Sequence, residues 1–182
     1  LPPLLMVVFV ALVFVACDGD KKKNNKQQSL STMEESKGDS TMYGVCGDNT
    51  GMHVLELITV QGDTLSYVFD VEDGATVKGG ILAGDRLAVV GYKNADGENE
   101  ATEVLNLTTL MGKWRSIDKQ FELMEDGTVL SGVKEESQPW TAWKVYNGKL
   151  LLNKDTFSVN ALGADSLYLE NAHGIFTFTR QK

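Results

Sequence analysis

Few residues in this chain have the types and spacing that catalysis or metal binding requires. The 182 residues include two histidines and two cysteines, too few for a structural zinc site or a disulfide framework. His53 lies in a strand-like run and His173 in an expected hairpin turn, and neither has a neighbouring Ser, Cys or Asp pattern of a catalytic motif. We therefore expect no enzyme, no metal and no cofactor, with an enzyme using His53 or His173 as the rival hypothesis.

The acidic residues are explained by turns rather than by a site. The chain has 25 Asp and Glu residues, and many aspartates lie beside glycines, where the carboxylate caps its own backbone. These aspartates are Asp63, Asp73, Asp85, Asp96, Asp126 and Asp165. No calcium-loop pattern and no phosphate-binding glycine loop is present. The net charge of −8 argues against a nucleic-acid partner.

One cysteine stands where the chain changes character. Residues 1–16 carry no charge, are too short for a transmembrane helix, and fit the apolar region of a signal peptide. The stretch Phe14-Val15-Ala16-Cys17 resembles the lipobox of bacterial lipoproteins, whose cysteine receives lipid, palmitate included, and becomes the mature N-terminus. The resemblance implies cleavage before Cys17 and a lipid anchor on it. Because a basic start and an initial Met are missing, we expect a signal peptide truncated at its N-terminus.

The residues after Cys17 fit a tether. Residues 18–40 consist mostly of Asp, Gly, Lys, Asn, Gln and Ser, a composition that cannot bury enough surface to offset chain entropy. We therefore expect a lipidated cysteine and flexible segment over 17–40. The lysines of Lys21–Lys23 either contact anionic head groups or are simply solvated.

The rest of the chain reads as two all-β units. In residues 41–109 we expect five strands and a small Greek-key barrel. The expected strands are Met42–Cys46, His53–Val60, Thr64–Asp70, Arg86–Tyr92 and Thr102–Thr108. In residues 110–182 we expect eight short strands in an up-and-down barrel, because Asn147-Gly148 and Asp126-Gly127 are strong hairpin signals. Their starts are near Lys113, Gln120, Thr128, Thr141, Lys149, Thr156, Ser166 and Gly174. The alternative is one continuous sheet in which Val104–Leu107 pairs with the second half.

Two resemblances refine this reading. The first half, "YGVCGDNTGMHVLELI … GDRLAVVGY", resembles an OB-fold in its layout. In the second half, "LMGKW" contains a Gly-x-Trp, and "GKW … FELMEDGTVLSG … WTAWKVYNGKLLL … TFSVNALGADSLYLE … FTFTR" resembles the short bacterial lipocalin-like envelope lipoproteins. That resemblance covers residues 110–182 and places Trp114 and Trp143 at the two characteristic tryptophans. It implies a barrel lipoprotein and carries over no functional residue.

The tryptophans are the remaining candidates for a site. We expect Trp114 to fill the base of the barrel. Trp140 and Trp143 should face opposite sides unless a bulge intervenes, so one of them is expected near a barrel rim. We name Trp140, Trp143 and Tyr146 as candidate ligand or partner contacts. The short strands indicate an interior packed with side chains rather than a deep cavity; its expected members are Leu123, Val129, Leu150, Leu152, Phe157 and Leu169.

The expected function follows from these features. We expect a non-enzymatic, lipid-anchored envelope lipoprotein, in the outer membrane rather than the inner, that acts as a binding or interaction module. Its partner is an envelope protein, a glycan or a small hydrophobic ligand. The alternatives are a carrier with a lipocalin-type cavity and a structural accessory of an envelope complex.

Overall fold

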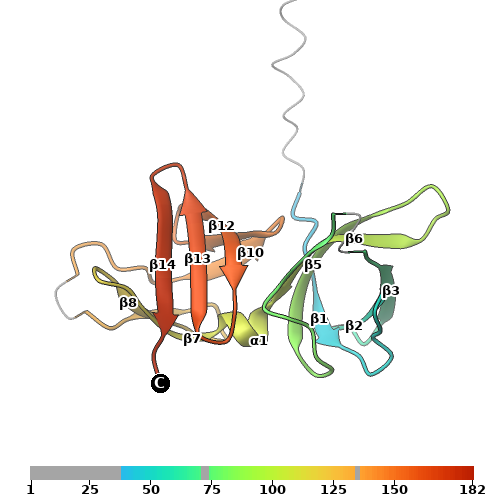
Figure 1. Cartoon of the computed structure of the whole chain (residues 1–182), viewed down its shortest axis with the longest axis horizontal. Helices are drawn as coiled ribbons and strands as arrows, with labels where there is room; N and C mark the ends of the chain where they lie inside the picture. Colours follow the sequence, from blue (N-terminus) through green and yellow to red (C-terminus); the bar gives the residue numbers. More distant parts are fainter. Residues whose placement is uncertain (1–37, 71–73, 134–135) are drawn as a thin grey trace, which may run out of the picture. The chain divides into compact units, whose positions relative to one another are not determined.

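The computed structural model describes residues 38–70, 74–133 and 136–182 (Figure 1). Within these residues the chain forms β-strands and one four-residue helix, which confirms the all-β expectation. The expected signal peptide, Cys17 and the tether up to residue 37 lie outside the described residues.

The first sheet has the connectivity expected of an OB-like barrel. Its described strands are β1 (Met42–Cys46), β2 (Val54–Thr59), β3 (Thr64–Val68), β4 (Thr76–Lys78), β5 (Arg86–Lys93) and β6 (Asn99–Asn106). They are ordered β3-β2-β1-β5-β6-β4, and β3 also pairs in parallel with β6 through Tyr67 and Val68. This extra pairing closes β1, β2, β3, β6 and β5 into a barrel, and β4 pairs in parallel with a later stretch of β6, Glu103–Leu105.

Alternating side chains build the interior of this first barrel. Leu55 and Leu57 on β2 and Leu87 and Val89 on β5 are fully buried. Residues two apart on a strand point to the same face, so the two side chains of each strand both point into the interior of this barrel. Cys46 is buried, with 2% of its surface exposed, and its thiol donates a hydrogen bond to the Thr50 hydroxyl at 3.2 Å.

The second sheet is an eight-stranded antiparallel barrel that is nearly closed. Its described strands are β7 (Gly112–Arg115), β8 (Gln120–Leu123), β9 (Val129–Ser131), β10 (Trp143–Tyr146), β11 (Lys149–Leu152), β12 (Asp155–Leu162), β13 (Ser166–Asn171) and β14 (Gly174–Arg180). The order β10-β11-β12-β13-β14-β7-β8-β9 leaves β9 and β10 as the two ends. These ends meet where the Val129 amide donates to the Thr141 carbonyl at 2.9 Å and the Trp143 amide donates to the Gly127 carbonyl at 2.7 Å. The expected up-and-down barrel is therefore confirmed.

Turn residues account for the hairpins of this barrel. Asn147 and Gly148 both have positive φ, 46° and 75°, as a tight two-residue hairpin turn requires. At the β8–β9 turn, the Thr128 amide donates to the Asp126 carboxylate at 2.9 Å and Gly127 has φ 84°. These turns were predicted from sequence, whereas the β11–β12 turn at Asn153, with φ 56°, was not.

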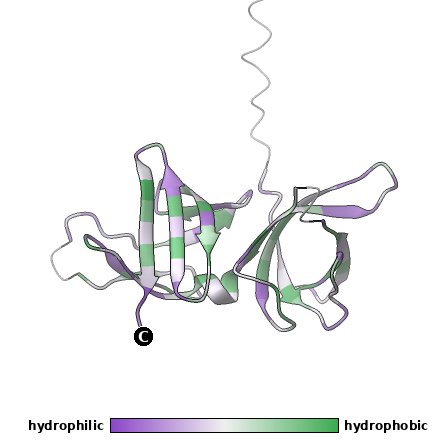
Figure 2. Ribbon diagram, in the orientation of Figure 1, coloured by the Kyte–Doolittle hydropathy of each residue, from purple (hydrophilic) through white to green (hydrophobic). Residues whose placement is uncertain are grey.

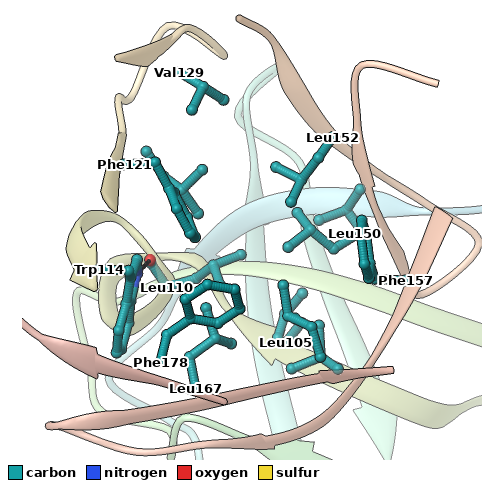
Figure 3. Packing of buried hydrophobic residues seen from close by; sticks show 14 of the residues in the cluster. Leu105, Leu110, Trp114, Phe121, Val129, Leu150, Leu152, Phe157, Leu167 and Phe178 are labelled. Atoms are coloured by element: carbon teal, nitrogen blue, oxygen red, sulfur yellow. Dashed lines mark hydrogen bonds between the residues drawn. The ribbon is translucent and has the colours of Figure 1, made fainter. Parts of the chain in front are cut away.

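A single hydrophobic cluster fills the second barrel. Hydrophobic and polar bands alternate along β13 and β14 (Figure 2), and the inward side chains converge on one interior (Figure 3). All six residues predicted for the interior are in this cluster: Leu123, Val129, Leu150, Leu152, Phe157 and Leu169. The prediction of a packed interior is confirmed for these residues.

Two elements of the first half differ from the sequence prediction. The expected strand Thr102–Thr108 is wrong at both ends, because β6 begins at Asn99 and gives way to the helix α1 (Leu107–Leu110). The side chain of Asn106 causes this change by accepting a hydrogen bond from the Thr109 amide at 2.8 Å, which caps a helix rather than extending a strand. Strand β4 was not predicted, because three residues carry too short a pattern to recognise.

The two halves share contacts as well as a chain connection. Residues 38–182 form one compact unit, and the second-barrel cluster includes Ala88, Leu105 and Leu107 from the first half. The Tyr43 hydroxyl donates to the Val145 carbonyl at 2.6 Å. The strands of the two sheets fall before and after α1, but independent folding of units 41–109 and 110–182 stays a prediction.

Candidate functional site

The Gly-x-Trp motif closes one end of the second barrel. Trp114 is fully buried, its indole N–H donates to the Leu110 carbonyl at 2.8 Å, and the Arg180 guanidinium lies 4.0 Å from its ring centre. Arg180 also donates to the carbonyls of Thr109, Met111 and Ala164. This arrangement agrees with the expected structural role of Trp114.

Gly112 is required for this packing. It has φ 112°, and a Cβ built on it would lie 2.8 Å from Arg180 Nη1. A side chain here would both strain the backbone and displace the guanidinium. The motif is thus a Gly–Trp–Arg group, of which sequence reasoning identified the first two members. Burial lowers the pKa of Arg180, but the group remains charged at neutral pH.

The three candidate contact residues do not form one site. Trp140 lies before β10 and is only 8% exposed, packed into the barrel cluster. Trp143 is half-buried, and its indole N–H donates to the Met124 carbonyl at 2.7 Å. Tyr146, at the end of β10, is half-buried, and the centre of its ring lies 5.4 Å from the ammonium of Lys144. A ligand or partner role for these residues stays a prediction, and the structure places each in a different environment.

Trp140 is held by the β11–β12 turn. The Asn153 side chain accepts hydrogen bonds from the Thr141 and Ala142 amides at 2.9 and 3.1 Å. Its amide group donates to the Pro139 carbonyl at 3.1 Å. These bonds fix the chain on both sides of Trp140 and turn its indole into the barrel. The indole N–H then donates to the Asp155 carboxylate at 3.3 Å.

A cavity of about 570 Å³ opens at this end of the second barrel. We call it the mouth. Its lining comes from the β7–β8, β9–β10 and β13–β14 connections and from strands β12, β13 and β14. The apolar lining is aromatic and consists of Trp140, Phe157, Phe176 and Phe178. A volume in this range accommodates a small organic ligand.

The aromatic rings of the mouth are packed edge to face. The ring centre of Trp140 lies 5.7 Å from that of Phe157 and 5.2 Å from that of Phe121. The ring centres of Phe157 and Phe176 are 5.8 Å apart. Phe178 is buried, whereas Phe176, two residues nearer the rim on β14, is 37% exposed. Phe176 therefore leaves apolar surface open at the mouth, and the deeper rings support it.

One ion pair crosses the polar rim. The Lys119 ammonium contacts the Glu136 carboxylate and lies 4.1 Å from the centre of the Trp140 ring. Glu136 also accepts a hydrogen bond from the Ser131 hydroxyl at 2.6 Å. Burial raises the pKa of Glu136, but the hydrogen bonds from Lys119 and Ser131 and the charge of Lys119 outweigh it. The net pKa is below its ordinary 4.5, so this carboxylate is ionised at neutral pH.

The barrel wall is open beside the mouth. Among the described residues, β14 pairs with β7 only through Thr179 and Arg180, because β7 ends at Arg115. A groove of about 740 Å³ lies along the open part of β14 and the β7–β8 turn. Phe176 lines both this groove and the mouth, so the two openings adjoin. Ile175, on the outer face of β14, is 63% exposed.

The residues considered for catalysis are not gathered at one place. His53 lies in the first half, is largely exposed, and has its Nδ1 3.9 Å from an Asp70 oxygen. His173 lines the mouth, with Asp155 as a further mouth residue. Over residues 38–70, 74–133 and 136–182, no group of three or more His, Cys, Asp or Glu side chains is arranged to hold a metal ion. No helix in these ranges is long and apolar enough to span a membrane.

Sequence reasoning missed most of the mouth. Lys119 and Glu136 come from two separate connections and Phe176 comes from strand β14, and no sequence motif joins the three. Of the lining residues, sequence reasoning had singled out Trp140 as a candidate contact, His173 as a candidate for catalysis and Phe157 as an interior residue. Comparison with known proteins adds no further assignment, since no family model, curated protein or solved structure matches the chain.

Proposed function

We propose that this chain is a non-enzymatic binding module whose second barrel takes the apolar part of a small amphipathic ligand at the mouth. The observation that carries the proposal is the cavity of about 570 Å³, which combines aromatic lining with a charged rim. Ligand sites typically have this composition, in which apolar walls provide affinity and a few polar groups provide orientation. The interior below the mouth is filled by the hydrophobic cluster, which favours a shallow site over a deep lipocalin-type cavity.

We further propose that the module is a lipocalin-like lipoprotein anchored in the cell envelope, in the outer membrane, through lipid on Cys17. The lipobox-like residues before Cys17 and the tether composition support this placement. Mass spectrometry of the native N-terminus tests it: a lipidated Cys17 at the mature N-terminus is expected. An unmodified Cys17, or retention of residues 1–16, would contradict it.

The ligand proposal is tested with N-phenyl-1-naphthylamine, a neutral fluorescent probe, and the purified chain produced without the lipid anchor. We expect saturable fluorescence enhancement with one site per chain. Phe176→Ala should weaken binding about fivefold, because it removes the exposed ring of the mouth. Ile175→Ala is the matched control, since its side chain lies on the outer face of the same strand.

A protein partner is the second candidate, favoured by the open edge of β14 and its exposed Ile175. An unpaired strand edge can add a strand from another chain. The same variants separate the two candidates. Absence of saturable probe binding, or equal effects of Phe176→Ala and Ile175→Ala, would overturn the mouth as the binding site.

A further inference from the structure

The aromatic face available in the mouth already carries a cation. The Lys119 ammonium lies 4.1 Å from the Trp140 ring centre, within the range of a cation–π contact. Phe121 and Phe157 pack against Trp140 in T-shaped geometry, with ring centres 5.2 and 5.7 Å away. Neighbouring rings therefore hold the indole in place, and a positive group from the chain itself lies over the ring.

The charge of the rim also favours a cation. The described lining contains three carboxylates, those of Asp118, Glu136 and Asp155. Its basic groups are one ammonium, of Lys119, and one imidazole, of His173. Lys119 is already paired with Glu136. Asp118 has no ion-pair or hydrogen-bond partner among the described side chains, and Asp155 accepts only the weak Trp140 N–H bond in that same part of the chain. The carboxylates of Asp118 and Asp155 can therefore interact with a ligand, whereas the Lys119 ammonium is already in an ion pair.

We propose that the mouth selects cationic amphipathic ligands, which place an alkylammonium group on Trp140 in place of the Lys119 ammonium. The apolar part of the ligand then lies along Phe157 and Phe176, and Glu136 and Asp155 face its charge. The exchange conserves charge on the indole face and releases Lys119 toward solvent. This inference rests on the proposed function of the mouth as a ligand site.

The test compares three ligands with the same eight-carbon chain by isothermal titration calorimetry at neutral pH. They are octylammonium, 1-octanol and octanoate. We expect octylammonium to bind about fivefold more tightly than 1-octanol, as a cation–π contact with a nearby carboxylate implies, and octanoate to bind most weakly. If none of the three binds, the proposed function fails. If 1-octanol binds as tightly as octylammonium, or octanoate binds more tightly, the mouth remains a ligand site and the selection of cations is overturned.

Variants at the rim distinguish two cases: replacement of the Lys119 ammonium on Trp140 by the ligand's ammonium, and attraction of the ligand to the rim carboxylates alone. Lys119→Met removes the competing ammonium, so octylammonium should bind about threefold more tightly while 1-octanol changes little. Lys113→Met, at an exposed lysine of β7, is the matched control and should have no effect. Glu136→Gln should remove most of the preference for octylammonium over 1-octanol, whereas Glu98→Gln, in the first half, makes the same charge change without this loss. Unchanged or weaker octylammonium binding in Lys119→Met would contradict the exchange.

Discussion

Replacing Arg180 by Met should destabilise the barrel strongly for a single substitution at a half-buried position. The guanidinium donates to three backbone carbonyls, at Thr109, Met111 and Ala164, and stacks on Trp114 at 4.0 Å. Each hydrogen bond contributes about 0.5–1.5 kcal/mol and the ring contact about 0.5–1 kcal/mol. Because Arg180 is only half-buried, we take the lower part of each range and expect a loss of about 2.5 kcal/mol.

Thermal unfolding followed by circular dichroism measures this loss. For a chain of this size, about 2.5 kcal/mol corresponds to a decrease in Tm of about 7 °C. Arg115→Met is the matched control, because Arg115 is exposed and its side chain takes part in no hydrogen bond or ion pair among the described residues. Its Tm should stay within about 1–2 °C of the parent. Equal Tm values for Arg180→Met and Arg115→Met would refute the role assigned to the Gly–Trp–Arg group.

Three further predictions concern the rim, the contact between the halves and the division of the chain. The lowered pKa of Glu136 means that its stabilising contribution is present at neutral pH and is lost as pH falls. The difference in Tm between the parent and Glu136→Gln should therefore shrink as pH falls below the ordinary Glu pKa of 4.5 and disappear once Glu136 is protonated in the folded chain, and a difference that persists at low pH would contradict this. Tyr43→Phe removes the hydrogen bond to Val145 and should cost about 1 kcal/mol, measured by urea unfolding; an unchanged midpoint would rule out a contribution from this bond. Residues 110–182 expressed alone should melt cooperatively, but at a lower Tm than the whole chain because Ala88, Leu105 and Leu107 leave the cluster; an unfolded product would mean one folding unit.

Most of the second barrel could be predicted because its signals are local. Asn147-Gly148 and Asp126-Gly127 specify turns by their own backbone preferences, and the alternation of Phe157 and Val159 specifies an inward face. The strand starts follow from these two signals. The first half was harder to predict from sequence, because α1 depends on a side-chain cap from Asn106 and β4 depends on parallel pairing with a distant strand.

The mouth could be predicted only in part, because barrel closure creates it. Trp140 was recognisable as an aromatic near a rim, but its orientation depends on Asn153 on the β11–β12 turn. Lys119 and Glu136 meet only when the β7–β8 and β9–β10 connections come to the same end of the barrel. Neither side chain alone differs from an ordinary surface charge, so the sequence has no pattern from which their pairing follows.

The most direct test of the account is to find which tryptophan a bound ligand reaches. The chain has three tryptophans, so a ¹⁵N–¹H correlation spectrum should resolve up to three indole N–H signals, assignable through Trp140→Phe, Trp143→Phe and Trp114→Phe. On titration with N-phenyl-1-naphthylamine, the account predicts a saturable shift of the Trp140 signal, because this indole lines the mouth. The Trp114 and Trp143 signals should stay in place, since their N–H groups are bonded to the Leu110 and Met124 carbonyls elsewhere in the barrel. A shift confined to Trp114 or Trp143, or no shift at saturating probe, would contradict the mouth as the binding site.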